Sequence, residues 1–74
     1  MWTNGSILIE GITYHYWIKH YEERSQYGIY GGKISKLMMK SNDEIVCNYD
    51  RSWDIEPVDM ETEIALEILL KKYN

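Results

Sequence analysis

The segment between residues 27 and 49 constrains the fold of this chain more than any other. It contains two stretches rich in apolar and β-branched residues, Ile34–Lys40 and Ile45–Tyr49, separated by the polar sequence Ser41–Glu44. Because Ser, Asn and Asp favour turns, this pattern predicts two antiparallel strands joined by a tight connection. In the first of these strands, Leu37 and Met39 would lie on one face and Met38 on the other.

The residues before this segment also have strand character. Trp2–Ile9 becomes apolar toward its end, and Glu10-Gly11 is typical of a short turn. Ile12–Glu22 is the longest alternating pattern in the chain. Its two predicted faces consist of Ile12, Tyr14, Tyr16 and Ile18, and of Thr13, His15, Trp17, Lys19 and Tyr21. Both faces carry large rings, which indicates that neither is an ordinary solvent-exposed face.

Three glycines lie just before Ile34, at positions 28, 31 and 32. Glycine this dense beside a strand predicts a bulge, a bend or a close backbone approach. The sequence Gly31–Ser35 also suggests a phosphate-binding loop, but its spacing fails. Tyr27 stands where that motif needs its first glycine, and Ile34 replaces the Ser or Thr after the lysine. We therefore favour a bulge or bend in the strand.

The C-terminal residues predict one α-helix from about Met60 to Tyr73, after an irregular link over Asp50–Val58. Asp59 suits the N-cap, and acidic and basic residues lie at the ends that the helix dipole favours: Glu61, Glu63, Lys71 and Lys72. The helix carries two apolar stripes. The wider one, expected to pack on the sheet, consists of Ala65, Leu66, Leu69, Leu70 and Tyr73. The narrower one consists of Met60, Ile64 and Ile68.

Together these patterns predict one α+β domain over residues 1–74, with three to four antiparallel strands in a meander and one C-terminal helix on one face. A domain this small is near the lower size limit for independent stability. Cys47 is the only cysteine, and one Cys and two His are too few for a structural zinc site. We therefore expect a homodimer, centred on the narrower helix stripe or on the rings of Ile12–Glu22.

The charge pattern bears on possible partners. The net charge of −4 disfavours nucleic acid and anionic membranes as partners. The charge is uneven, because residues 1–40 hold five Lys/Arg against three Glu, whereas residues 41–74 hold three against nine Asp/Glu. No signal peptide or membrane-length apolar run is evident. With the lone thiol, this predicts a cytoplasmic location.

The sequence Asp50–Asp54 concentrates two carboxylates, a guanidinium, a hydroxyl and an indole. One interpretation is a recognition loop, because Arg and Trp dominate interface hot spots. The other is structural: the carboxylates cap the backbone, Arg51 pairs with a carboxylate, and Trp53 fills the end of the core. We favour the structural interpretation.

Few residues suggest catalysis. His15 and His20 would lie on opposite faces of a strand, and Cys47 alternates with Ile45 and Tyr49, which predicts a buried thiol. We therefore predict no enzymatic activity, no catalytic residue, no metal and no cofactor. One alternative is a nucleic-acid-associated protein that stacks bases on the aromatic N-terminal sheet. A small enzyme is a more remote alternative.

At Tyr27–Ile29, Gly31–Leu37 and Tyr49–Asp54 the chain resembles a family of short uncharacterised proteins from Gram-positive bacteria and their phages or prophages. The resemblance covers most of the chain from Trp2 to the C-terminal helix and implies a phage-associated origin. It supplies no catalytic residue, cofactor or substrate.

We therefore expect a non-enzymatic protein-binding module or phage accessory factor that is homodimeric and has a host or phage protein as a further partner. The candidate interaction residues are Trp17, Tyr21, Arg51, Trp53, Met60, Ile64 and Ile68.

Overall fold

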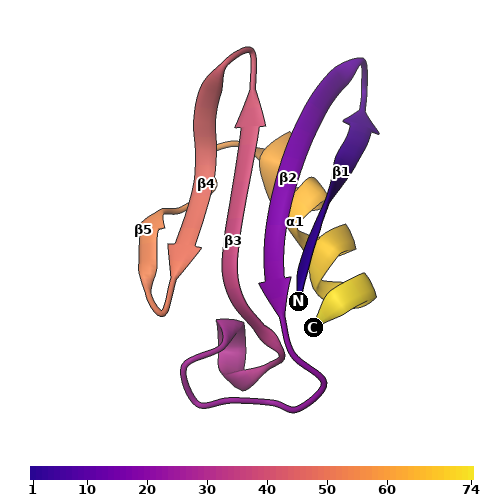
Figure 1. Ribbon diagram of the computed structural model, residues 1–74. Coiled ribbons are helices and arrows are strands. Elements are labelled where there is room, and N and C mark those ends of the chain that lie inside the picture. Colours follow the sequence, from indigo (N-terminus) through magenta and orange to yellow (C-terminus); the bar gives the residue numbers. More distant parts are fainter.

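The computed structural model describes all 74 residues as a five-stranded antiparallel sheet with one α-helix on one face (Figure 1). The strands follow one another in chain order across the sheet. Their bounds are β1 (Trp2–Ile9), β2 (Ile12–His20), β3 (Ile34–Ser41), β4 (Glu44–Asp50) and β5 (Trp53–Ile55), and the helix is α1 (Met60–Tyr73). A meander with a C-terminal helix was the expected architecture, and it is confirmed.

The number of strands is larger than predicted. The sequence indicated three to four strands and an irregular link over residues 50–58, whereas β5 adds a fifth strand within that link. β5 pairs with β4 through Asn48 opposite Ile55 and Tyr49 opposite Trp53. A three-residue strand is too short to show an alternating pattern, so its sequence resembles a loop.

The glycine-rich segment shows one of the predicted alternatives, a close backbone approach, but not the bulge or bend in a strand that we favoured. Residues 28, 31 and 32 lie in the β2–β3 loop, which contains a short 3-10 helix (Ile29–Gly31), and not in a bulged or bent strand. A Cβ on Gly28 would collide with the carbonyl of Gly32, so close approach of the loop backbone to itself requires glycine there. β2 correspondingly ends at His20, two residues before the predicted end.

The core lies between the sheet and α1. Its buried side chains are Tyr14, Tyr16, Ile18, Ile29, Ile34, Leu37, Met39, Cys47, Tyr49, Ala65, Leu66 and Leu69. The wider helix stripe thus faces the sheet as predicted, with Leu70 and Tyr73 packed at its margin. Buried Thr62 was not expected in the core, and its hydroxyl donates to the hydroxyl of Tyr14 at 3.2 Å. This bond satisfies two polar groups inside the helix–sheet contact.

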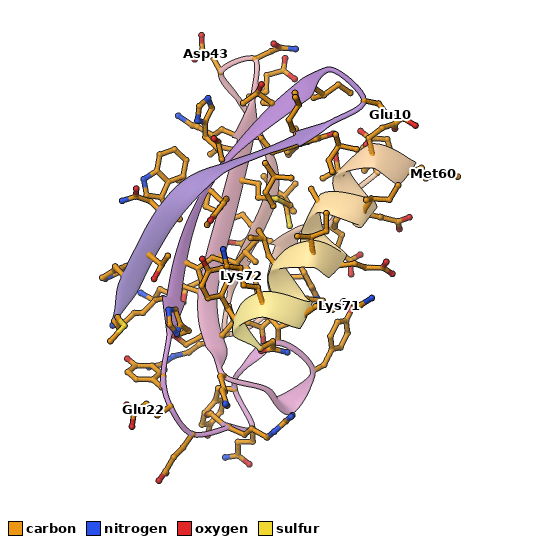
Figure 2. The ribbon with its side chains drawn as sticks, turned by 90° about the vertical axis from the view of Figure 1, so that its right-hand side faces the viewer. Glu10, Glu22, Asp43, Met60, Lys71 and Lys72 are labelled. Carbon is orange, nitrogen blue, oxygen red and sulfur yellow. The ribbon has the colours of Figure 1, made fainter.

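The helix has the predicted bounds and the predicted N-cap. The Asp59 side chain accepts a hydrogen bond from the backbone N–H of Thr62 at 2.8 Å. α1 begins at the end of the sheet where the two hairpin turns lie, marked by Glu10 and Asp43 (Figure 2). It ends with Lys71 and Lys72 nearer the β2–β3 loop. Neither α1 nor the 3-10 helix has the length and apolar character needed to cross a membrane.

Leu69→Ala is expected to destabilise the protein by about 2–5 kcal/mol, because Leu69 is almost completely buried under the sheet. Val58→Ala is the control, since this aliphatic side chain is 92% exposed, and its effect should stay within about 0.5 kcal/mol. Denaturant unfolding measures both. An unchanged midpoint for Leu69→Ala would contradict the placement of α1.

The N-cap predicts a component of acid sensitivity. The hydrogen bond from Thr62 holds the pKa of Asp59 below its ordinary value. A lowered pKa contributes stability that is present above the ordinary value and is lost as the pH falls through the folded value. Asp59→Asn preserves a cap but removes the charge, so the free energy of unfolding should fall less steeply below about pH 4. Parallel pH curves for the two proteins would contradict this assignment.

Candidate interaction surfaces

The sheet face opposite α1 is uncovered, and its side chains combine aromatic, apolar and basic groups. We call it the open face and define it by Trp2, Trp17, Met38, Lys19, Lys36 and Lys40. The register places Trp17 between Asn4 on β1 and Met38 on β3. In the next row, Lys19 lies opposite both Trp2 and Lys36. Trp17 and Lys19 therefore lie side by side along β2 on this face, and the row of Lys19 continues through Lys36 to Asp50 on β4.

A small pocket of about 210 Å³ lies at the end of the open face beside the β2–β3 loop. We call it the basic pocket. It is lined by Lys19, Tyr21, Ser25, Tyr27, Ser35, Lys36 and Arg51. Three of the chain's eight Lys and Arg residues line it, and no carboxylate does. An acidic protein thus carries a local concentration of positive charge.

Aromatic rings flank the cations of this pocket. The ammonium of Lys19 lies 5.9 Å from the ring centroid of Trp2 and 5.7 Å from that of Tyr21. Arg51 lies over the ring of Tyr27 at 6.0 Å. The expected pairing of Arg51 with a carboxylate is therefore wrong, and the ion pair of this region joins Lys36 to Asp50 at 3.8 Å. Arg51 instead turns from the β4–β5 hairpin toward the β2–β3 loop.

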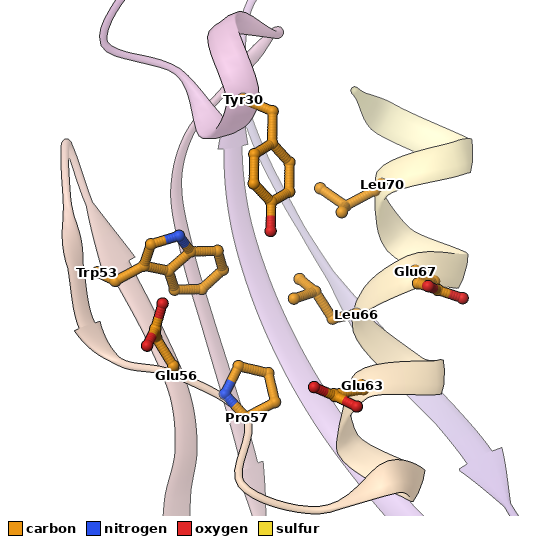
Figure 3. A pocket seen from close by; sticks show the side chains of 8 residues that line it. All are labelled: Tyr30, Trp53, Glu56, Pro57, Glu63, Leu66, Glu67 and Leu70. Carbon is orange, nitrogen blue, oxygen red and sulfur yellow. The ribbon is translucent and has the colours of Figure 1, made fainter.

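A second concavity lies on the helix side of the sheet, between α1 and β5 (Figure 3). This acidic groove has a volume of about 370 Å³ and is lined by Tyr30, Trp53, Glu56, Pro57, Glu63, Leu66, Glu67 and Leu70. Trp53 is half-buried, and its ring contacts Tyr49 edge to face with centroids 5.0 Å apart. Trp53 packs against the core, as the structural interpretation of residues 50–54 requires.

The narrower helix stripe points away from the sheet. Met60, Ile64 and Ile68 are 71%, 38% and 41% exposed, and we call them the outer stripe. The candidate interaction residues therefore lie in three separate places on the structure. It brings Trp17, Tyr21 and Arg51 to the open face and basic pocket. Trp53 lies across the sheet in the acidic groove, and the outer stripe lies on the far side of α1.

The reactive side chains are not gathered at one place. His15 is exposed on the open face, whereas the Nε2 atom of His20 lies 3.0 Å from the Thr3 hydroxyl and its ring contacts Tyr73. Cys47 is buried, and burial, helped by the charge of Glu56, raises the pKa of its thiol to about 12. The chain holds no group of three or more His, Cys, Asp or Glu side chains arranged to bind a metal ion.

Comparison with known families gives one match that covers the chain. Residues 1–74 match the family described as a domain of unknown function, DUF7678. The chain belongs to this family. Expected membership in a family of unknown function is thereby confirmed, whereas its association with Gram-positive bacteria and phages stays a prediction. The comparisons with curated proteins and with solved structures gave no match.

Sequence reasoning did not find the basic pocket of this DUF7678 domain. Alternation along β2 placed Trp17, Lys19 and Tyr21 on one face, but it says nothing about which residues of other strands lie beside them. Pairing of Lys19 with Lys36 depends on the register, which shifts at the end of β2. The excess of cations in residues 1–40 was the one available signal.

Trp53→Ala is expected to lower the free energy of unfolding by about 1–3 kcal/mol, because it removes half-buried aromatic surface and the contact with Tyr49. Tyr30→Ala is the control, since Tyr30 lines the same groove but is largely exposed. Its effect should stay within about 0.5 kcal/mol. If Trp53→Ala leaves stability intact, the recognition interpretation of this loop replaces the structural one.

Proposed function

We propose that this DUF7678 protein is a small non-enzymatic interaction module that acts as a homodimer through the outer stripe of α1. The observation that carries this proposal is the row formed by Met60, Ile64 and Ile68, which are exposed in the single chain. The opposite side of α1 is already packed on the sheet, so the chain's own fold cannot cover this row. Burying it against a second copy supplies apolar contact that a 74-residue domain otherwise lacks.

The charges on α1 support a twofold contact. In an antiparallel arrangement about a twofold axis, the first turn of one helix lies opposite the last turn of the other. The first turn carries Glu61 and Glu63, and the last turn carries Lys71 and Lys72. If Ile64 of one copy faces Ile68 of the other, acidic and basic turns meet at both ends. Such exposed pairs add little energy, but they favour the antiparallel orientation.

The open face is less suited to self-association, although it also exposes large rings. A twofold contact brings the same patch of two copies together. Two open faces would place Lys19, Lys36 and Lys40 of one copy near those of the other, and like charges in close contact are destabilising. A dimer formed through α1 leaves both open faces free.

Other features of the chain bear on its chemistry, location and partners. A non-enzymatic role is supported by the suppressed ionisation of Cys47 and by the location of His15 and His20 on opposite sides of the sheet. A cytoplasmic location suits the unpaired thiol of Cys47. The resemblance to phage and prophage proteins supports an accessory role with a host or phage protein as partner.

Association with nucleic acid is the second candidate function, favoured by the cations of the open face.

Sedimentation velocity at micromolar concentration tests the dimer. We expect a dimer mass for the wild type and a monomer mass for the double variant Ile64→Glu, Ile68→Glu, because four charges would enter the contact. Trp17→Glu is the matched control, since it adds a charge to the open face and should leave the dimer intact. Circular dichroism confirms that each variant is folded. A wild-type monomer, or a dimer dissociated by Trp17→Glu alone, would contradict the proposal.

A further inference from the structure

The basic pocket has the charge and the donors to hold an anion. Lys19 from β2, Lys36 from β3 and Arg51 from the β4–β5 turn converge on it. Asp50 pairs with Lys36 at 3.8 Å, but both side chains are partly exposed, and such a pair competes poorly with a multiply charged ligand. The Ser25 hydroxyl adds a further donor, whereas the Ser35 hydroxyl already donates to the Lys19 carbonyl at 3.3 Å. The Ser25 hydroxyl oxygen accepts from the backbone N–H of Tyr27 at 3.2 Å, which leaves its hydrogen free to donate to a ligand.

The walls of this pocket are fixed without a ligand. Asn74 ties the end of α1 to the β2–β3 loop, since its side chain donates to the Ile29 carbonyl and accepts from the Ile34 N–H, both at 3.0 Å. The Tyr49 hydroxyl donates to the carbonyl of Tyr27 at 2.9 Å. The bond from Tyr49 holds the backbone of Tyr27, over whose ring Arg51 lies. Such preorganisation lowers the entropy that binding must overcome.

The backbone at Arg51 is unfavourable for an arginine. Its φ of +65° lies in the left-handed region that glycine adopts at much lower cost. The hairpin turn would therefore form more easily with glycine at this position. Glu10, Tyr30, Asn42 and Asp43 share this left-handed φ, and Arg51 differs from them because its side chain lines the basic pocket. Arginine at this position supplies a guanidinium group, which the glycine that the turn favours would lack.

The surface beside the basic pocket is suited to flat rings. Lys36 also lines a neighbouring hollow of about 210 Å³, together with Trp2, Trp17 and Met38, and the carboxylates of Asp50 and Asp54 border the side of this hollow formed by β4 and β5. Trp17 and Lys36 lie on adjacent strands, which run about 4.8 Å apart. An anionic group held by Lys36 therefore lies next to exposed indole rings. A ligand that alternates anionic groups with planar rings matches this surface, and a free phosphate or a lipid headgroup matches only part of it.

We propose that the open face and the basic pocket bind single-stranded nucleic acid, with backbone phosphates bound by Lys19, Lys36 and Arg51 and bases stacked on Trp2 and Trp17. The negative net charge does not prevent this, because binding responds to the local field. Much of the negative charge lies elsewhere, and α1, on the other side of the sheet, carries Glu61, Glu63 and Glu67. The inference specifies the second candidate function, association with nucleic acid, and does not depend on the proposed dimer.

Fluorescence anisotropy of a labelled oligothymidine of about 12 nucleotides, titrated with the full chain at several salt concentrations, tests the proposal. Three phosphate contacts predict a slope of about −2 for log K against log salt concentration. Arg51→Gly should weaken binding roughly tenfold and reduce this slope by about 0.7. Its melting temperature should stay equal or rise, because glycine relieves the left-handed backbone.

A second variant separates stacking from charge. Trp17→Ala should weaken binding roughly fivefold or more and leave the salt slope unchanged, because it removes a ring and no cation. Arg24→Ala is the matched control for Arg51→Gly, since Arg24 is an exposed cation of the β2–β3 loop that does not line the pocket. Its affinity should remain close to that of the wild type.

Several outcomes would overturn the proposal. One is the absence of any anisotropy change at low salt with protein in the micromolar range. Another is an equal loss of affinity in Arg24→Ala and Arg51→Gly, which would indicate unspecific attraction to the whole surface. A third is Arg51-dependent binding to vesicles of anionic lipid or to inorganic phosphate, with no binding to the oligonucleotide. Any of these results would assign the basic pocket to another ligand or to none.

Discussion

The structure depends on the packing of one α-helix against a five-stranded sheet. Only a limited stripe of α1 is available for that contact, and Ala65, Leu66 and Leu69 occupy it. One helix cannot cover both faces of a sheet, so one face remains open to solvent (Figure 1). On the covered side the helix does not reach β5, which leaves the acidic groove. The open face, the acidic groove and the outer stripe are therefore all exposed because no second helix or sheet covers them.

The packing of α1 on the sheet also holds in place the β2–β3 loop, which borders the basic pocket. Because α1 ends beside the β2–β3 loop, Asn74 can bond to Ile29 and to Ile34. The core also orients Tyr49, whose hydroxyl holds Tyr27 in place. The β2–β3 loop is therefore held on two sides, by Asn74 at the end of α1 and by Tyr49 from the core. A loop with three glycines would otherwise sample many conformations, and the cost of ordering it would fall on ligand binding.

Local patterns in the sequence predicted the elements well, because periodicity and capping depend on neighbouring residues. The bounds of β1 and α1, the N-cap at Asp59 and the burial of Cys47 all follow from such patterns. Contacts between distant residues were not predictable in this way. The short strand β5 and the location of Arg51 over Tyr27 depend on register and turn geometry, which composition does not encode. Of the residues that line the basic pocket, only Tyr21 and Arg51 were among the predicted interaction residues, and the sequence did not predict that they lie together.

The distribution of unfavourable features suggests where this fold is constrained by something other than stability. The core is well satisfied, since no buried polar side-chain atom lacks a hydrogen-bond partner. The costs lie at the surface instead, where Glu10, Tyr30, Asn42, Asp43 and Arg51 have a left-handed backbone, Trp2 is exposed, and Lys19 lies directly opposite Lys36. Arg51, Trp2 and the Lys19–Lys36 pair lie around the same corner of the open face, and this is the corner that we propose as a ligand site. A substitution at any of them leaves the core untouched, so the proposed role of this corner can be tested without destabilising the fold.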